Sequence, residues 1–359
     1  MTIARKNLVD PTKLEHIHLI SRCARRSFIM GADSYTGKNF DHRKGWIQDR
    51  MKLLVQNFTI EVGAYAIMDN HLHILARNRS DYNLKLSDRE VIDRWITLYT
   101  PRLSTSKKVS YEVKLENHKL IILKDPERMA ELRLRLSSVS WFMKTLKEFI
   151  ARKANKEDDC KGTFWEARFK SQLLTSHEAV ILCQTYIDLN PIRAGISTTP
   201  EGSKNTSAYE RIHSMQSKEN LKSSRAIKNE QGEFTQKQKA KIHESFLNRN
   251  DDKWLAPFYK GYGHTKCFYQ FVTQKEYFEL LDWSGREIKK NKSGAIPSNL
   301  KPIFDRLEID RDLWVEALKN YKNWFQHIVG DVEKAWNLIS GITNHYFKGG
   351  KENRQLFKK

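Results

Sequence analysis

The sequence contains no uninterrupted apolar stretch that approaches the roughly 20 residues needed to cross a bilayer. Its N-terminus, MTIARKNLVDPTKLEH, lacks the apolar core of a signal peptide. The four cysteines, Cys23, Cys160, Cys183 and Cys267, are widely separated and form no CxxC pair, which argues against a disulfide framework and a cysteine-bound zinc site. These absences predict a cytoplasmic protein without membrane attachment.

Acidic residues are also scarce relative to basic ones. Across 359 residues, 63 lysines and arginines outnumber 43 aspartates and glutamates, and the formal net charge is +20. Such an excess favours a polyanionic partner, because each phosphate that a cation neutralises releases condensed counterions. Charge alone therefore favours nucleic acid over the alternative of an ordinary basic protein. The 39% of hydrophobic residues suffices for a core, and the length predicts two domains.

Hydrophobic periodicity predicts alternating strands and helices in the N-terminal half. The expected strands are 14–23, 58–68, 71–78 and 162–174, and the expected helices are 41–58, 127–155 and 175–190. Alternation in 58–68 places Phe58, Ile60, Val62, Ala64, Ala66 and Met68 on one face. A capping box, Thr175-x-x-Glu178, opens the last helix, and Pro191 closes it.

The resulting order is strand, helix, strand, strand, helix, strand, helix. This order predicts an α+β, ferredoxin-like (split βαβ) fold, with an antiparallel sheet, helices on one face and the other face open. Residues 79–126 are polar and irregular, which indicates an insertion, with a possible small hairpin in 104–123. Residues 1–200 therefore form the expected first domain, 201–251 a polar connector, and 252–359 a basic, aromatic-rich and mostly helical C-terminal domain.

MDNHLHIL, residues 68–75, places two histidines inside an apolar run. On a strand, His71 and His73 point the same way, about 6.6–6.8 Å apart, and Leu72 and Ile74 take the core-facing side. Two imidazoles at this separation can converge on one metal ion, and the alternative is a pair of ordinary surface histidines. A third ligand must come from elsewhere, because the sequence has neither HExxH nor H-x-H-x-D-H.

Other residues compete for a role in this site. His16 and His18 repeat the spacing, but they have no obvious partner and are interpreted as structural or phosphate-contacting. TYIDLNP places Tyr186 and Asn190 four residues apart on a helix. Asn190 offers a carbonyl oxygen to a hard cation, and Tyr186 a hydroxyl that can act as a nucleophile. A helical tyrosine is more often a core residue, and Tyr65 is a rival candidate.

Three ordered segments, YAIMDNHLHIL, GTFWEARFKSQLL and YIDLNPIRAGI, resemble the REP-associated tyrosine transposases of the HUH single-strand DNA nuclease superfamily. The resemblance covers residues 1 to about 215, and the region around DWSGREIKKNKSGAIP is similar to the C-terminal extension of longer members. It implies a divalent ion, Mg²⁺ or Mn²⁺, on His71 and His73, with Asn190 as third ligand. It also implies that Tyr186 attacks a phosphate to give a 5′-phosphotyrosine.

The expected function is therefore a metal-dependent endonuclease and transposase that cleaves and rejoins single-stranded DNA near REP-type hairpins. A single-stranded DNA hairpin is the expected partner and nucleoid association the expected location, while monomer and dimer both remain open. The alternatives are a domesticated, non-catalytic hairpin-binding protein and a replication or conjugation nickase. Cations and one aromatic are candidate DNA contacts: Arg25, Arg26, Arg77, Arg168, Lys170, Arg193, Trp283, Arg286, Lys289 and Lys290.

Overall fold

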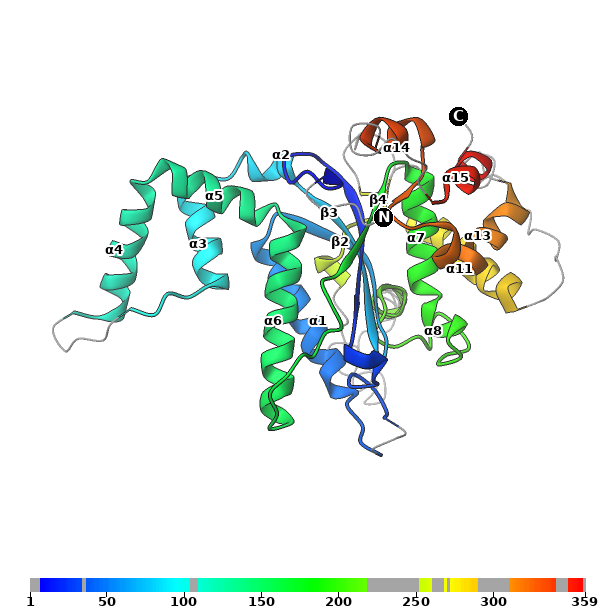
Figure 1. Ribbon diagram of the computed structural model, residues 1–359, viewed down its shortest axis with the longest axis horizontal. Coiled ribbons are helices and arrows are strands. Elements are labelled where there is room, and N and C mark those ends of the chain that lie inside the picture. The colour runs from blue at the N-terminus through cyan, green and yellow to red at the C-terminus, as the bar shows by residue number, and fades with distance from the viewer. Residues whose placement is uncertain are drawn as a thin grey trace, which may run out of the picture.

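The computed structural model describes residues 7–33, 37–103, 109–217, 252–259, 268–269, 272–289, 310–339 and 348–357. At its centre is a five-stranded sheet in the order β2-β3-β1-β4-β5 (Figure 1). The strands are β1 (His16–Arg22), β2 (Ile60–Ile67), β3 (His71–Asn78), β4 (Lys170–Leu174) and β5 (Ile328–Val329). The first four pair antiparallel, and β5 pairs parallel with β4, so the sheet is mixed.

Helices cover both faces of this sheet. On one face, α1 (His42–Asn57) and α6 (Val139–Glu157) bury an apolar stripe against β1, β2 and β3. On the other face lies α7 (His177–Asp188), backed by α11 (Gln274–Lys289) and α13 (Arg311–Trp324) (Figure 1). The prediction of an open face is therefore wrong, because helices of the C-terminal region complete a second core there. The described part of the C-terminal region also contains α14 (Val332–Ile339) and α15 (Gly350–Leu356).

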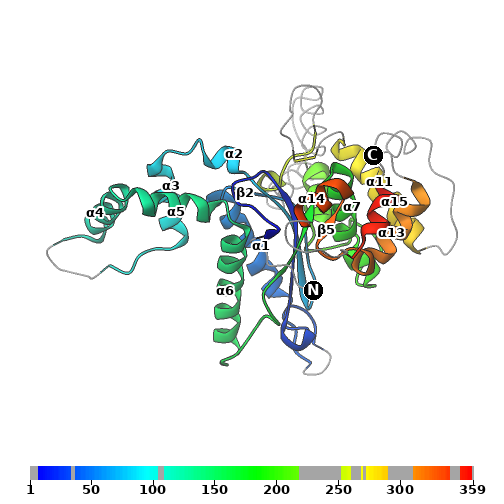
Figure 2. The same ribbon diagram turned by 45° about the horizontal axis from the view of Figure 1, so that its top comes forward.

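The predicted insertion, residues 79–126, is mostly helical where the structure describes it. Residues 80–136 contain α2 (Ser80–Asn83), α3 (Asp88–Leu98), α4 (Tyr111–Leu123) and α5 (Pro126–Leu136). Ser87 and Glu90 form a capping box at α3, and Ser110 caps α4. The interpretation of 104–123 as a hairpin is wrong, because residues 111–123 are helical; residues 104–108 lie outside the described part of the chain. These helices extend away from the sheet as an arm (Figures 1 and 2).

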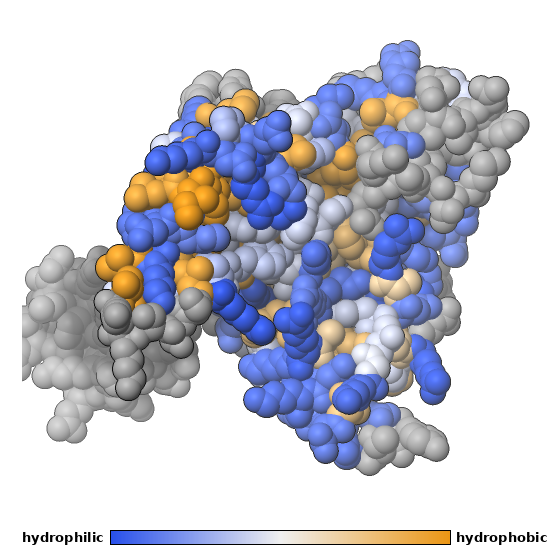
Figure 3. All heavy atoms as spheres, turned by 60° about the vertical axis from the view of Figure 1, so that its left-hand side comes forward, coloured by the Kyte–Doolittle hydropathy of each residue, from blue (hydrophilic) through white to orange (hydrophobic). Residues whose placement is uncertain are grey.

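The arm exposes apolar side chains. No residue of α4 is buried, and Val113, Leu120 and Ile121 are all exposed. Figure 3, which brings this side of the molecule forward, shows apolar patches within a largely hydrophilic surface.

The single helix expected over 127–155 is two helices. Its predicted apolar stripe is buried as expected, but α5 ends at Leu136 and α6 begins at Val139. The carbonyl of Leu136 accepts hydrogen bonds from both the amide and the hydroxyl of Thr59, which precedes β2. This tertiary contact takes the place of the next helical hydrogen bond, and Ser138 adopts an extended conformation that starts the new helix.

The prediction that alternate residues of 58–68 share one face is wrong beyond Gly63, because a β-bulge interrupts the strand there. The register of β2 against β3 shifts between Val62 and Ala64, so the side chains after Gly63 change face. Val62 and Tyr65 belong to the core under α1 and α6, whereas Ala64 and Ala66 belong to the core under α7. Tyr65 therefore points away from the histidine side of the sheet.

The segment 162–174 is a strand only from Lys170 onward. Phe164 and Trp165 are both buried instead of alternating, because Trp165 bridges Cys23 and donates its ring N–H to the Lys147 carbonyl. The predicted cap of the following helix is also displaced by one residue. Ser176 caps α7, while the Thr175 hydroxyl lies within hydrogen-bonding distance of the carbonyls of Val329 in β5 and of Asp331.

Candidate active site

The two histidines of β3 face the second core. Leu72, Ile74 and Ala76 alternate with them and lie in the core under α1 and α6, as the strand period predicts. His73 is buried and His71 is half-buried, and their ring centroids are 4.9 Å apart. The pair is therefore convergent rather than a pair of independent surface side chains.

The helix after β4 brings Tyr186 to this pair. The Tyr186 ring centroid lies 5.7 Å from that of His73. Asn190 begins α8 (Asn190–Arg193), directly after α7, and its side chain is within hydrogen-bonding reach of the His71 ring. Residues from β3, α7 and α8, more than 100 positions apart, thus form one cluster.

His18 also belongs to the cluster, although its sequence context favours a structural or phosphate-contacting role. The antiparallel pairing of β1 with β3 places it beside His73, and its Nε2 lies 2.8 Å from His73 Nδ1. Its Nδ1 lies 2.7 Å from Gln172 Oε1 on β4. The Gln172 side-chain N–H in turn donates to the carbonyl of Phe325 at 3.0 Å. The H-x-H spacing that His16 and His18 share with His71 and His73 is the sequence signal from which a role of His18 in this site could have been predicted.

Burial keeps these imidazoles neutral near pH 7. It lowers the pKa of His18 to about 4 and that of His71 to about 4, and it holds the pKa of His73 well below its usual range. Neutral imidazoles retain a nitrogen lone pair, which is the form that binds a metal or accepts a proton.

Cations surround the cluster. After burial, the positive charge of Arg22 contributes to the lowered pKa of both His71 and His73. The charge of Lys322 likewise lowers the pKa of His71, and the charge of Arg193 lowers the pKa of His73. Sequence reasoning singled out Arg193 but missed Arg22, which shares the strand face of His18, and Lys322, which comes from α13. An anion entering this site would meet several positive charges.

Tyr186 is covered by the C-terminal region. Its ring stacks on that of Tyr321 of α13, with centroids 4.2 Å apart and an interplanar angle of 19°. The Arg193 guanidinium lies 4.7 Å from the centroid of the Tyr186 ring. Only 6% of Tyr186 is exposed. The tyrosine is therefore oriented by stacking and cation–π contact.

The donor atoms of this site suit a divalent cation that takes only a few of its ligands from the protein. Within the described ranges, no group of three His, Cys, Asp or Glu side chains is arranged to hold a metal ion. His71, His73 and Asn190 instead offer two imidazoles and one amide oxygen, all neutral. Such donors are compatible with a borderline or hard divalent ion whose other positions are taken by water and phosphate.

The predicted DNA contacts divide by exposure. Four are exposed: Arg25, Arg168, Lys170 and Arg286. Trp283, the aromatic residue among the candidate DNA contacts, is only 5% exposed and packs in the second core, so its ring does not face DNA in this structure. The side chains of Arg26 and Lys289, and the whole of Lys290, lie outside the described part of the chain.

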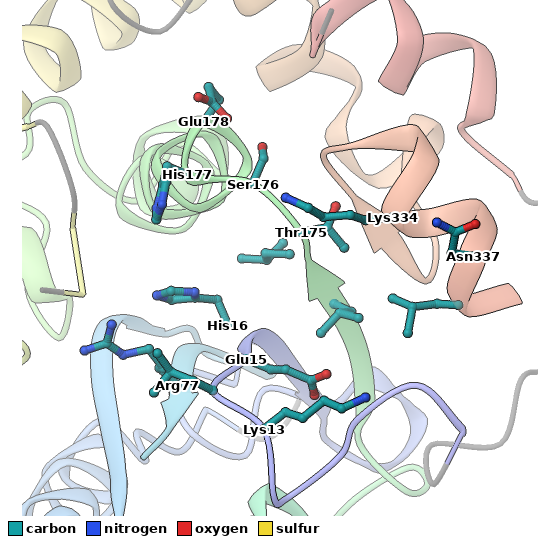
Figure 4. Close-up of a pocket in the computed structure, with 14 residues that line it drawn as sticks. Lys13, Glu15, His16, Arg77, Thr175, Ser176, His177, Glu178, Lys334 and Asn337 are labelled. Carbon is teal, nitrogen blue, oxygen red and sulfur yellow. The ribbon is translucent and has the colours of Figure 1, made fainter. Parts of the chain in front are cut away.

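Arg77 lies on the histidine side of β3 but outside the cluster. It is buried, forms an ion pair with Glu61, and lines a separate pocket of about 590 Å³ together with His16, His177 and Lys334 (Figure 4). His16, the partner of His18 in the repeated spacing, thus faces a different region, where its Nε2 lies 3.2 Å from the Phe268 carbonyl.

Comparisons with known proteins give little guidance. The chain matches no protein-family model, and no curated protein matches it. A solved structure of a REP-associated tyrosine transposase bound to a REP hairpin is similar to 57% of this chain and 82% of that chain, at 10% identity and a TM-score of 0.30. No helix of the described ranges is long and apolar enough to span a membrane.

Proposed function

We propose that the chain is a metal-dependent endonuclease and strand transferase acting on single-stranded DNA near hairpins, in the manner of the REP-associated tyrosine transposases. The proposal takes residues 1–200 as a ferredoxin-like nuclease domain, with residues 79–126 as an insertion. The strand order β2-β3-β1-β4, with all three pairings antiparallel, supports this assignment.

One observation carries the proposal. Tyr186 lies within ring-contact distance of two neutral histidines, His18 on β1 and His73 on β3, and Asn190 is within hydrogen-bonding reach of a third histidine, His71. A tyrosine that served only the core would need apolar neighbours. Tyr186 belongs to the second core and stacks on Tyr321, but its neighbours also include His18, His73 and the Arg193 guanidinium, so part of its environment is polar and positively charged.

In the proposed reaction the Tyr186 hydroxyl oxygen attacks a backbone phosphorus. The bond between phosphorus and the 3′ oxygen breaks, the phenolic proton leaves, and a proton is taken up by the departing 3′ oxygen. The products are a 5′-phosphotyrosine and a free 3′-hydroxyl. The new ester retains the energy of the phosphodiester, so attack by another 3′-hydroxyl can rejoin DNA without a nucleotide triphosphate.

His71, His73 and Asn190 would hold Mg²⁺ or Mn²⁺. A divalent cation there would polarise the phosphoryl oxygen and offset the charge that develops on it. Arg22, Lys322 and Arg193 add fixed positive charge around the same point. These cations attract the phosphate backbone and contribute to its orientation before attack.

The coverage of Tyr186 favours a second candidate from another class. With 6% of the residue exposed and Tyr321 stacked on its ring, the tyrosine is poorly accessible to DNA in this conformation. A non-catalytic hairpin-binding protein would need only the exposed cations, such as Arg25, Arg168 and Lys170.

A cleavage assay separates the two candidates. Single-stranded palindromic oligonucleotides from DNA flanking the gene, incubated with protein and Mg²⁺ or Mn²⁺, should be nicked, with a protein–DNA adduct on denaturing gels. Tight hairpin binding without nicking under either ion would favour the non-catalytic protein and contradict the nuclease.

A further inference from the structure

We infer that His18 and Gln172 are positioning residues that fix the tautomer of His73, and that they do so from an anchor in the C-terminal region, the carbonyl of Phe325. The inference deepens the proposed function, because it assigns the residues that prepare one proposed ligand. Its structural part requires neither metal nor cleavage.

The chain of hydrogen bonds has a defined direction because it begins at a group that can only accept. The Phe325 carbonyl accepts from the Gln172 amide nitrogen at 3.0 Å, which orients the amide. Gln172 Oε1 must then face His18. An amide oxygen is also only an acceptor, so His18 Nδ1 carries a proton and donates it.

The next bond follows from the charge state of His18. Fully buried, His18 is neutral and has one ring proton, which is on Nδ1. Its Nε2 therefore accepts, and the donor at 2.8 Å is His73 Nδ1. His73 is neutral as well, so its Nε2 carries the lone pair.

A single hydrogen bond, to the side chain of the preceding residue, fixes the same tautomer in His71. Its Nδ1 lies 2.6 Å from Asn70 Oδ1, an acceptor, and this leaves the lone pair on Nε2. Both histidines of β3 are thus held in one tautomer by acceptors on their Nδ1 side. An acceptor of this kind orients an imidazole ligand and raises its basicity, and its loss typically weakens metal affinity by about 10–100-fold.

Wild-type protein, free of metal and labelled with ¹⁵N in histidine, provides the first test. Long-range ¹H–¹⁵N correlation spectra should show His73 protonated on Nδ1 and bare on Nε2. The same readout in His18→Leu, which has no acceptor, should show loss of this single tautomer. His18→Gln should preserve it, because the glutamine side-chain oxygen can accept from His73 Nδ1.

Titration with Mn²⁺ alone, followed by calorimetry, provides the second test. We expect His18→Leu to bind Mn²⁺ about 10–100-fold more weakly than wild type and His18→Gln to recover most of the loss. His16→Leu is the matched control: it removes a histidine from the same face of β1 that bonds Phe268 and not His73, and should leave Mn²⁺ affinity unchanged. If His18→Leu does not fold, Gln172→Met removes the acceptor of His18 instead and should produce mixed tautomers.

A bare Nδ1 on His73 in the wild-type spectrum would overturn the inference, as would a His18→Leu protein that keeps the wild-type tautomer and affinity. An equal loss of affinity in His16→Leu would also overturn it, since the effect would not depend on the hydrogen bond to His73. If instead the expected tautomer is found and the wild-type protein binds no Mn²⁺, the relay stands and the proposed metal-dependent function fails.

Discussion

Replacement of Tyr186 by phenylalanine separates chemistry from folding more cleanly than any other substitution in the site. The hydroxyl of Tyr186 makes no hydrogen bond within the described part of the chain, so the change removes one oxygen and leaves the contacts of the ring. The stack on Tyr321 and the contact with Arg193 remain. We therefore expect the free energy of unfolding to change by no more than about 0.5 kcal/mol.

The effect on cleavage should be far larger. The substitution removes the only atom of Tyr186 that can form the bond to phosphorus, and loss of a nucleophile typically lowers the rate by several orders of magnitude, on the order of 10⁴-fold or more. Hairpin binding should stay close to wild type, because phosphate and base contacts lie on other residues.

The assay uses one oligonucleotide with either end labelled. A 5′-phosphotyrosine retains the 3′ portion of the DNA, so the 3′-labelled strand should migrate with wild-type protein on a denaturing gel, and the 5′-labelled strand should only shorten. Tryptic digestion should place the nucleotide in residues 171–193, which contain a single tyrosine. Cleavage by Tyr186→Phe at the wild-type rate, or an adduct on Tyr65, would refute the assignment of the nucleophile.

Three further predictions address the metal, the fold and pH. His73→Ala, like EDTA, should abolish cleavage and preserve hairpin binding, whereas full activity in EDTA would exclude a metal role. Gly63→Val should lower the free energy of unfolding by roughly 1–3 kcal/mol in urea titrations, because a Cβ would lie 2.3 Å from the Phe268 ring. Gly45→Ala is the control and should show no loss, because a Cβ added there would meet no atom within 4 Å beyond its chain neighbours and the backbone of its own helix. Stability should fall below about pH 6.5 by roughly 1.4 kcal/mol per pH unit for each histidine that the fold keeps neutral, and a flat profile from pH 6.5 to 5 would contradict this. These histidines are His16, His18 and His71, whose pKa values burial lowers to about 3, 4 and 4.

The sign of the pH effect follows from protonation in the unfolded chain. An unfolded histidine has a pKa near 6.5 and binds a proton below that value, while the buried ring stays neutral until about pH 3–4. The unfolded state therefore binds more protons in this window. Stability is complete above pH 6.5 and is lost as the pH falls toward the folded-state pKa values.

Local periodicity predicted the relative positions of site residues that belong to one strand. His71 and His73 share a face because a strand alternates with a period of two, and the order of the first four strands follows from patterning in the same way. The serines that cap α3 and α4 are helix-start signals in the sequence, but the polar composition of that stretch favoured its interpretation as an irregular insertion.

Features that depend on distant contacts could not be predicted in this way. The role of His18 depends on the pairing of β1 with β3, and the break before α6 depends on Thr59, 77 residues from its partner Leu136. The face of Tyr65 depends on a bulge at Gly63, where Phe268 and Tyr269 approach the backbone. Trp283 was a candidate DNA contact because its neighbours in the sequence are cationic, but its burial depends on how the C-terminal region packs.

The pairing of β4 with β5 has a consequence for synthesis of the chain. Leu173 and Leu174 form a parallel ladder with Ile328 and Val329, which leave the ribosome about 155 residues later. The neighbours of α7 in α11 and α13 also lie far along the chain, and until Gln274 and the residues after it are synthesised, the side of the sheet that carries the histidines lacks this cover. A nascent chain therefore exposes apolar surface and an unpaired strand edge for a long interval, so this half of the molecule is the part that should need a chaperone.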